Sequence, residues 1–137
     1  MSAQSQLLEA RRLAQLLLSA TELSKEIFAE IAREVGVPVQ VARALCLIEG
    51  PTSMSELASK FTCDKSYITP LADQMEEMGL LERVPGVDRR KKLLELTPLG
   101  LTAQTQLEAQ IALRSPVMVS LTPTERETLE QLLAKLS

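Results

Sequence analysis

The sequence predicts a mainly α-helical protein of six helices, with a β-hairpin inserted after the fourth helix. Its 137 residues are 45% hydrophobic but only 2% aromatic, and leucine, alanine, glutamate and glutamine, which favour helices, dominate. Apolar residues recur at three- and four-residue steps over long stretches. Residues that start and stop helices separate these stretches. A chain of this length has room for a single domain, residues 1–137.

The first predicted helix covers residues 5–34 and carries a wide apolar stripe. Its main row consists of Leu13, Leu16, Ala20, Leu23, Ile27 and Ile31. A second row consists of Leu17, Phe28, Ala32 and Val35. Two rows make the stripe wider than one neighbouring helix would cover. Gly36 is a stop signal, and we expect Pro38 to occupy the first position of a second helix that runs to about Glu49.

Two short helices are expected next. Ser53 and Glu56 have the spacing of a capping box, in which each residue satisfies a backbone amide of the other. Asp64 is a candidate N-cap for a helix that extends to Met78, and Gly79 would close that helix. The sequence therefore predicts two helices joined by a tight turn.

A charged hairpin follows these helices. Residues 80–84 and 92–96 are apolar-rich segments that we predict to be strands. Between Arg83 and Glu95 the chain holds five cations and two carboxylates, a local excess of +3 in a protein whose net charge is −3. Because Asp88 lies two residues before Arg90, we expect the two side chains to form a bidentate pair.

Two further helices are predicted over residues 98–115 and 123–136. Thr97 and Thr122 each precede a proline, which is the pattern of an N-cap followed by proline at the first helical position. Glu125 adds a second capping box.

The helix over residues 64–78 has two distinct faces. The inward face consists of Ile68, Leu71, Ala72, Met75 and Met78. The opposite face consists of Ser66, Pro70 and Asp73, flanked by Tyr67, Thr69 and Gln74. Small polar side chains at the start of such a helix can touch base edges or phosphates. Two short helices followed by a basic hairpin are typical of a winged helix-turn-helix, with the second helix in the major groove and the wing at the minor groove.

Several short segments resemble the MarR family of winged helix-turn-helix transcriptional regulators, in order and spacing. They are Ser55–Ala58, Asp64–Ser66, Met75–Arg83, Asp88–Arg90 and Leu96–Gly100. The resemblance covers nearly the whole chain and implies a homodimer held by the helices in 5–34 and 98–136, with a winged lobe over 38–97. It also implies an operator of pseudo-palindromic double-stranded DNA and a small-molecule effector.

The resemblance and the charge pattern together define the candidate DNA-binding residues. They are Ser53, Asp64, Lys65, Ser66, Tyr67, Thr69, Asp88, Arg89, Arg90 and Lys91. The chain departs from the family at Pro70 and Gln74, where many relatives carry arginine. Pro70 resembles a peroxide-sensing subgroup, but that subgroup's reactive cysteine lies in the first long helix, where this chain has none.

The composition argues against other classes of protein. There is no histidine, and no nucleophile–base pair, metal cluster or phosphate loop can be assembled, so we expect no enzyme activity, cofactor or metal. Cys46 and Cys63 are interpreted as packing residues, and a redox role for Cys63 is the minor alternative. The N-terminus lacks the pattern of a signal peptide and no apolar run is long enough to span a membrane, so a cytoplasmic location is expected.

The functional prediction is a sequence-specific DNA-binding regulator, a repressor released by a small-molecule or redox signal. A winged-helix module for protein–protein contact, without an operator, is the alternative. The acidic net charge and the two missing arginines keep that alternative open.

Overall fold

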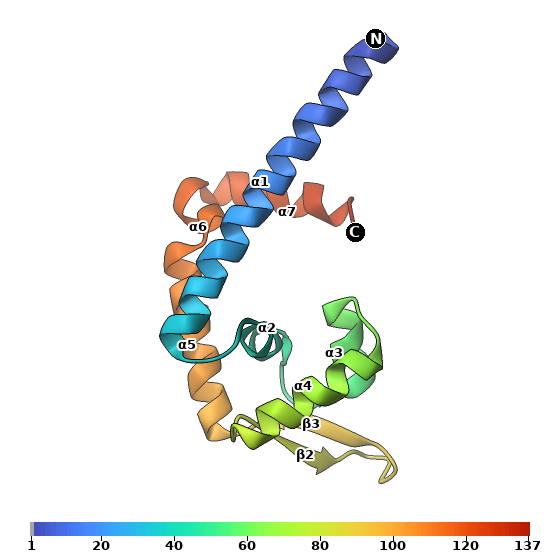
Figure 1. Ribbon diagram of the computed structural model, residues 1–137, viewed down its shortest axis with the longest axis vertical. Coiled ribbons are helices and arrows are strands. Elements are labelled where there is room, and N and C mark those ends of the chain that lie inside the picture. Colours follow the sequence, from blue (N-terminus) through green and yellow to red (C-terminus); the bar gives the residue numbers. More distant parts are fainter. Residues whose placement is uncertain (1) are drawn as a thin grey trace. The chain divides into compact units, whose positions relative to one another are not determined.

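The computed structural model describes residues 2–137, which divide into two compact units. One unit comprises Ile31–Ala109, and the other comprises the residues up to Glu30 together with Gln110–Ser137. The helices are α1 (Ala3–Val35), α2 (Val39–Leu47), α3 (Met54–Phe61), α4 (Lys65–Glu77), α5 (Pro98–Arg114), α6 (Pro116–Ser120) and α7 (Pro123–Ala134), and the strands are β1 (Thr52–Ser53), β2 (Leu81–Pro85) and β3 (Lys92–Leu96) (Figure 1). The predicted mainly helical winged fold is confirmed.

The unit Ile31–Ala109, called here the winged unit, has a closed apolar core. Helices α2, α3 and α4 pack on one another, and α4 also contacts β2. The largest side chains with almost no exposed surface come from these three helices, from α1, β3 and α5, and from the residue after α2. They are Ile31, Val41, Leu45, Ile48, Leu57, Ile68, Met75, Leu94 and Leu107. The inward face predicted for α4 is buried at Ile68, Leu71, Ala72 and Met75.

The sheet contains one strand more than the sequence predicted. Its order is β1-β3-β2, with both pairs antiparallel. The register of β2 and β3 places Arg83 opposite Leu94. The extra strand β1 is only two residues long and pairs Thr52 with Leu94, so neither its length nor its partner leaves a periodic signal in the sequence.

Three helix ends in the winged unit close with the same backbone motif. After α1, α3 and α4, the amide that follows the left-handed residue bonds back to the carbonyl five residues earlier, as in the Schellman motif. Gly36 and Gly79 supply the left-handed residue at two of these ends, with φ of +93° and +75°. At the third end the left-handed residue is Thr62, with φ +57°. A β-branched residue is strained in this conformation.

A close backbone approach ties the end of α4 to the start of α5. The Thr97 hydroxyl donates to the Gly79 carbonyl and accepts from the Gly100 amide. The Thr97 amide donates to the Leu80 carbonyl. A Cβ on Gly100 would overlap that same carbonyl. This is the physical reason for threonine and glycine at these two positions in the segment Leu96–Gly100.

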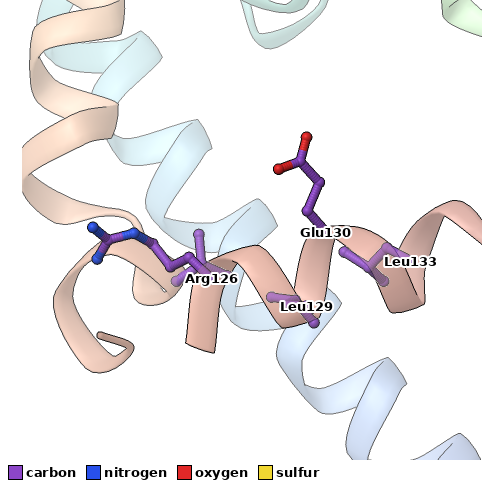
Figure 2. Close-up of a pocket in the computed structure, with 5 residues that line it drawn as sticks. Arg126, Leu129, Glu130 and Leu133 are labelled. Atoms are coloured by element: carbon purple, nitrogen blue, oxygen red, sulfur yellow. The ribbon is translucent and has the colours of Figure 1, made fainter. Parts of the chain in front are cut away.

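The other unit, called here the terminal unit, leaves its apolar residues exposed. The exposed leucines of α1 are Leu7, Leu8, Leu13, Leu16, Leu17, Leu18 and Leu23. Helices α6 and α7 line a pocket of about 270 Å³ with Val117, Arg126, Leu129, Glu130 and Leu133, and Figure 2 shows the last four along α7. The stripe predicted on the first helix is therefore buried only at its C-terminal end, at Ile31 and Ala32.

Several predicted helix boundaries need correction. Helix α2 begins at Val39, because Pro38 takes an extended conformation and occupies the N-cap position. The short helix α6 lies between the helices predicted over 98–115 and 123–136, where no helix was predicted, although Ser115 and Pro116 repeat the cap-then-proline pattern. The capping box at Thr122 forms completely, whereas at Ser53 only half of it forms, with the Ser53 hydroxyl accepting from the Glu56 amide. Within residues 2–137, no helix is long and apolar enough to cross a membrane.

Candidate nucleic-acid interface

The start of α4 presents the side chains that the sequence predicted for the major groove. Asp64, Lys65, Ser66, Tyr67 and Thr69 are all exposed. Asp64 occupies the N-cap position, but its side chain makes no capping hydrogen bond. The Tyr67 amide donates to the Asp64 carbonyl at 3.1 Å. The Asp64 side chain leaves the amides of Lys65 and Ser66 to an acceptor such as a phosphate oxygen, which the positive end of a helix favours.

Tyr67 is held against the preceding turn by aromatic contacts. Its ring centre lies 6.1 Å from that of Phe61, with the rings tilted by 51°. Arg43 lies over the Phe61 ring, with its guanidinium carbon 4.5 Å from the ring centre. Its Nη2 also donates to the Phe61 carbonyl at 3.2 Å. A cation at the C-terminal end of α3 is favourable. Residues of α2, α3 and α4 thus form one stack, which sequence reasoning missed because its members are far apart in the chain.

The N-terminal end of α3 is more enclosed than the start of α4. Ser53 is half-buried, belongs to β1 and uses its hydroxyl as the N-cap of α3. Ser53 thus lies at a helix start, as expected for a phosphate contact, but its hydroxyl already accepts a hydrogen bond from the Glu56 amide.

The wing tip carries exposed cations, but it is not braced in the way the sequence predicted. The Asp88 Oδ1 atom accepts from the backbone amide of Arg90 at 3.1 Å, and no ion pair joins these two side chains in the part of the chain that the structure describes. The prediction of a bidentate pair is wrong because aspartate readily bonds the amide two residues on, forming a local turn. Arg89, Arg90 and Lys91 extend from this turn into solvent.

Arg83 does not belong with the cations of the wing tip. Its Nη2 lies 2.6 Å from Asp73 Oδ1, and its Nη1 lies 3.7 Å from Glu76 Oε1. Both carboxylates belong to α4. Figure 1 shows α4 beside the hairpin that contains Arg83. A side-chain contact between residues ten apart in the sequence therefore joins α4 to β2, the first strand of the hairpin.

The two cysteines are half-buried and unpaired with each other. Burial, and to a smaller extent the charge of Glu108, raises the pKa of the Cys46 thiol. A thiol with a raised pKa forms less of the reactive thiolate, which agrees with a packing role for Cys46. Cys63 lies in the turn between α3 and α4, where its amide bonds the Ala58 carbonyl.

Comparisons with known proteins agree with this geometry. The model of the MarR family matches residues 44–92. A protein of Thauera aromatica, named as a transcriptional regulatory protein for the hcr operon, is 38% identical over 87 residues, which are 61% of this chain and 52% of that protein. The chain thus spans about half the length of this relative.

Solved structures extend the similarity to most of the chain. A mutant MarR from E. coli is 25% identical, with a TM-score of 0.72 over 90% of this chain and 95% of that one. A mutant E. coli MarR complexed with operator DNA is 24% identical, with a TM-score of 0.77 over 93% of this chain and 95% of that one. Fold and site together define a winged helix-turn-helix protein. The chain is similar to the MarR family over residues 44–92 and, over 87 residues, to a protein named as a transcriptional regulatory protein.

Proposed function

We propose that this protein is a sequence-specific, double-stranded DNA-binding regulator of transcription. One observation carries the proposal: the start of α4, where Asp64 makes no side-chain cap, exposes small polar side chains in the same unit that exposes the cations of the wing. The similar fold of a MarR protein solved with operator DNA supports it. In this reading α4 reads base edges in the major groove and the wing contacts phosphates or the minor groove.

Separate roles for the helix and the wing can be tested by substitution. We expect Arg90→Ala to weaken binding to all duplexes and to lower the salt slope by about one, because it removes one phosphate contact. Ser66→Ala or Thr69→Ala should instead change which bases are preferred. Duplexes selected from random DNA, followed by affinity measurements at several salt concentrations, provide both readouts. A protein that selects no sequence, and whose affinity does not depend on salt, would support the protein–protein alternative.

We further propose that the protein acts as a homodimer through its terminal unit. The exposed leucines of α1 and the apolar lining of the pocket on α7 support this proposal, because apolar surface of this extent usually marks an interface. A two-fold dimer would place two copies of α4 on one face of the duplex, with half-site centres about 10 base pairs apart. Footprinting tests this, since inserting about five base pairs would move one half-site to the opposite face.

The regulatory direction forms the last part of the proposal. The family resemblance supports a repressor whose release from DNA follows a small-molecule or redox signal. The raised pKa of Cys46 disfavours that thiol as a redox sensor. Expression of a reporter behind a selected operator, with and without the protein, distinguishes repression from activation.

A further inference from the structure

The recognition helix has an unfavourable charge for its proposed task. Helix α4 contains one cation, Lys65, and three carboxylates, Asp73, Glu76 and Glu77, which give it a net charge of −2. DNA presents a dense row of negative phosphates. The carboxylate of Asp73 lies on the exposed side of α4. Without compensation, the C-terminal half of this helix would repel the backbone that the helix must approach.

The compensation comes from the wing. Arg83 reaches from β2 to two of the three carboxylates, with N–O distances of 2.6 Å to Asp73 and 3.7 Å to Glu76. The side chain of Arg83 is 29% exposed, whereas those of Asp73 and Glu76 are 56% and 44% exposed. The cation is therefore the more enclosed member of the cluster, and the two carboxylates are the more exposed ones.

We propose that Arg83 is a positioning residue for DNA binding: it holds the side chains of Asp73 and Glu76 and neutralises their charge, so that α4 can approach the phosphate backbone. The inference rests on the proposed DNA-binding function. It assigns Arg83 a role different from that of Arg89 and Arg90, whose guanidinium groups form no ion pair with a carboxylate among the described residues. We expect the ion pairs of Arg83 with Asp73 and Glu76 to add little to the free energy of unfolding, because exposed ion pairs contribute little to folding.

A double-mutant cycle tests this role. Wild-type protein, Arg83→Ala, Asp73→Asn/Glu76→Gln and the triple variant are compared for affinity to a duplex selected by the wild type and to a random-sequence duplex. Arg89→Ala, alone and combined with Asp73→Asn/Glu76→Gln, is the matched control for loss of a wing cation. Thermal melting of each variant shows whether it is folded.

We expect Arg83→Ala to melt close to the wild type but to bind both duplexes about tenfold more weakly or worse, because like charges juxtaposed at an interface are strongly unfavourable. Neutralising the two carboxylates should recover most of this loss in the Arg83→Ala protein. It should change affinity little in the wild type. In the Arg89→Ala protein the same neutral substitutions should recover nothing comparable.

Other results would overturn the inference. If Arg83 itself bound a phosphate, the neutral substitutions would free it and raise affinity at least as much in the wild type as in Arg83→Ala. If Arg83 only held the wing in place, removing its partners would not restore binding. Unchanged affinity of Arg83→Ala, while the wild type binds DNA, would refute this inference alone. Failure of the wild type to bind any duplex would refute both this inference and the proposed function.

Discussion

The two units of this protein use the same residue type in opposite ways. In the winged unit, Leu45 and Leu57 have no exposed surface. In the terminal unit, Leu16 is 62% exposed although it lies on a helix with the same apolar spacing. Apolar residues at three- and four-residue steps therefore identify a helix face that is buried by packing. They do not show whether the residues that pack on it come from the same chain. The winged unit supplies its own core, and the terminal unit depends on a partner in the proposed dimer.

The sharpest test of this difference is one chemical change made in both units. We expect Leu45→Ala to cost about 2–5 kcal/mol of unfolding free energy, because it leaves a cavity in a closed core. Leu16→Ala should act mainly on the dimer, so its effect should grow as the protein is diluted. Urea unfolding at several protein concentrations separates the two. A loss for Leu16→Ala that is large and independent of concentration would contradict the comparison.

In the winged unit, a side chain added where two backbone segments lie close together is expected to lower the free energy of unfolding nearly as much as Leu45→Ala. Alanine in place of glycine within a helix ordinarily stabilises it by about 1 kcal/mol, yet Gly100→Ala should destabilise by about 1–3 kcal/mol or more, because the new Cβ overlaps the Leu80 carbonyl. Gly36→Ala provides the control. Its Cβ would meet nothing within 4 Å, so only the left-handed backbone opposes it, by about 1–2 kcal/mol. A stabilised Gly100→Ala protein would disprove the close approach.

In the turn between α3 and α4, a substitution is expected to raise the free energy of unfolding instead of lowering it. Thr62→Gly should raise the unfolding free energy by about 0.5–1 kcal/mol, because it relieves the left-handed strain but loosens the unfolded chain. Thr62→Ala keeps a Cβ and should give a smaller gain. Thermal unfolding of the two variants measures the difference. Destabilisation by glycine would mean that the threonine side chain has contacts that outweigh its strain.

The smallest effect is expected in the terminal unit, at the start of α7. Hydrogen bonds from the Thr122 backbone amide first, and with the Thr122 side chain second, hold the pKa of Glu125 below its ordinary value. The charged form is favoured in the folded state, so its contribution is complete above the ordinary pKa and is lost as the pH falls through the lowered one. NMR titration of the Glu125 carboxyl should show this shift. Thr122→Val should reduce it without abolishing it.

The sequence predicts the local features of this protein well because their causes are local. The caps at Thr97 and Thr122 and the stop at Gly36 depend on neighbouring residues, and each lies where its pattern indicates. Helix α6 could have been predicted too, since Ser115 and Pro116 repeat the signal used for the helices on either side. Its five residues are simply too few to show periodicity.

The features that sequence reasoning missed depend on contacts made by the fold. The pair between Arg83 and Asp73 exists because β2 packs against α4, and the side chains alone do not indicate it. The Asp88–Arg90 prediction shows the reverse error. A side-chain pair was predicted, but the Asp88 carboxylate instead accepts a hydrogen bond from the backbone amide of Arg90.

Cleavage of the wing tip by a protease should also report whether this protein is bound to DNA. Four consecutive basic residues, from Arg89 to Lys92, lie exposed on or beside a loop that is closed by two backbone hydrogen bonds. Loop tips of this kind are preferred sites of proteolytic cleavage, and trypsin cuts after arginine and lysine. The free protein should therefore be nicked first at the wing, which divides the chain between β2 and β3. If the wing lies against DNA in the complex, the same peptide bonds become shielded, and the ratio of cut to intact chain reads out binding without any label.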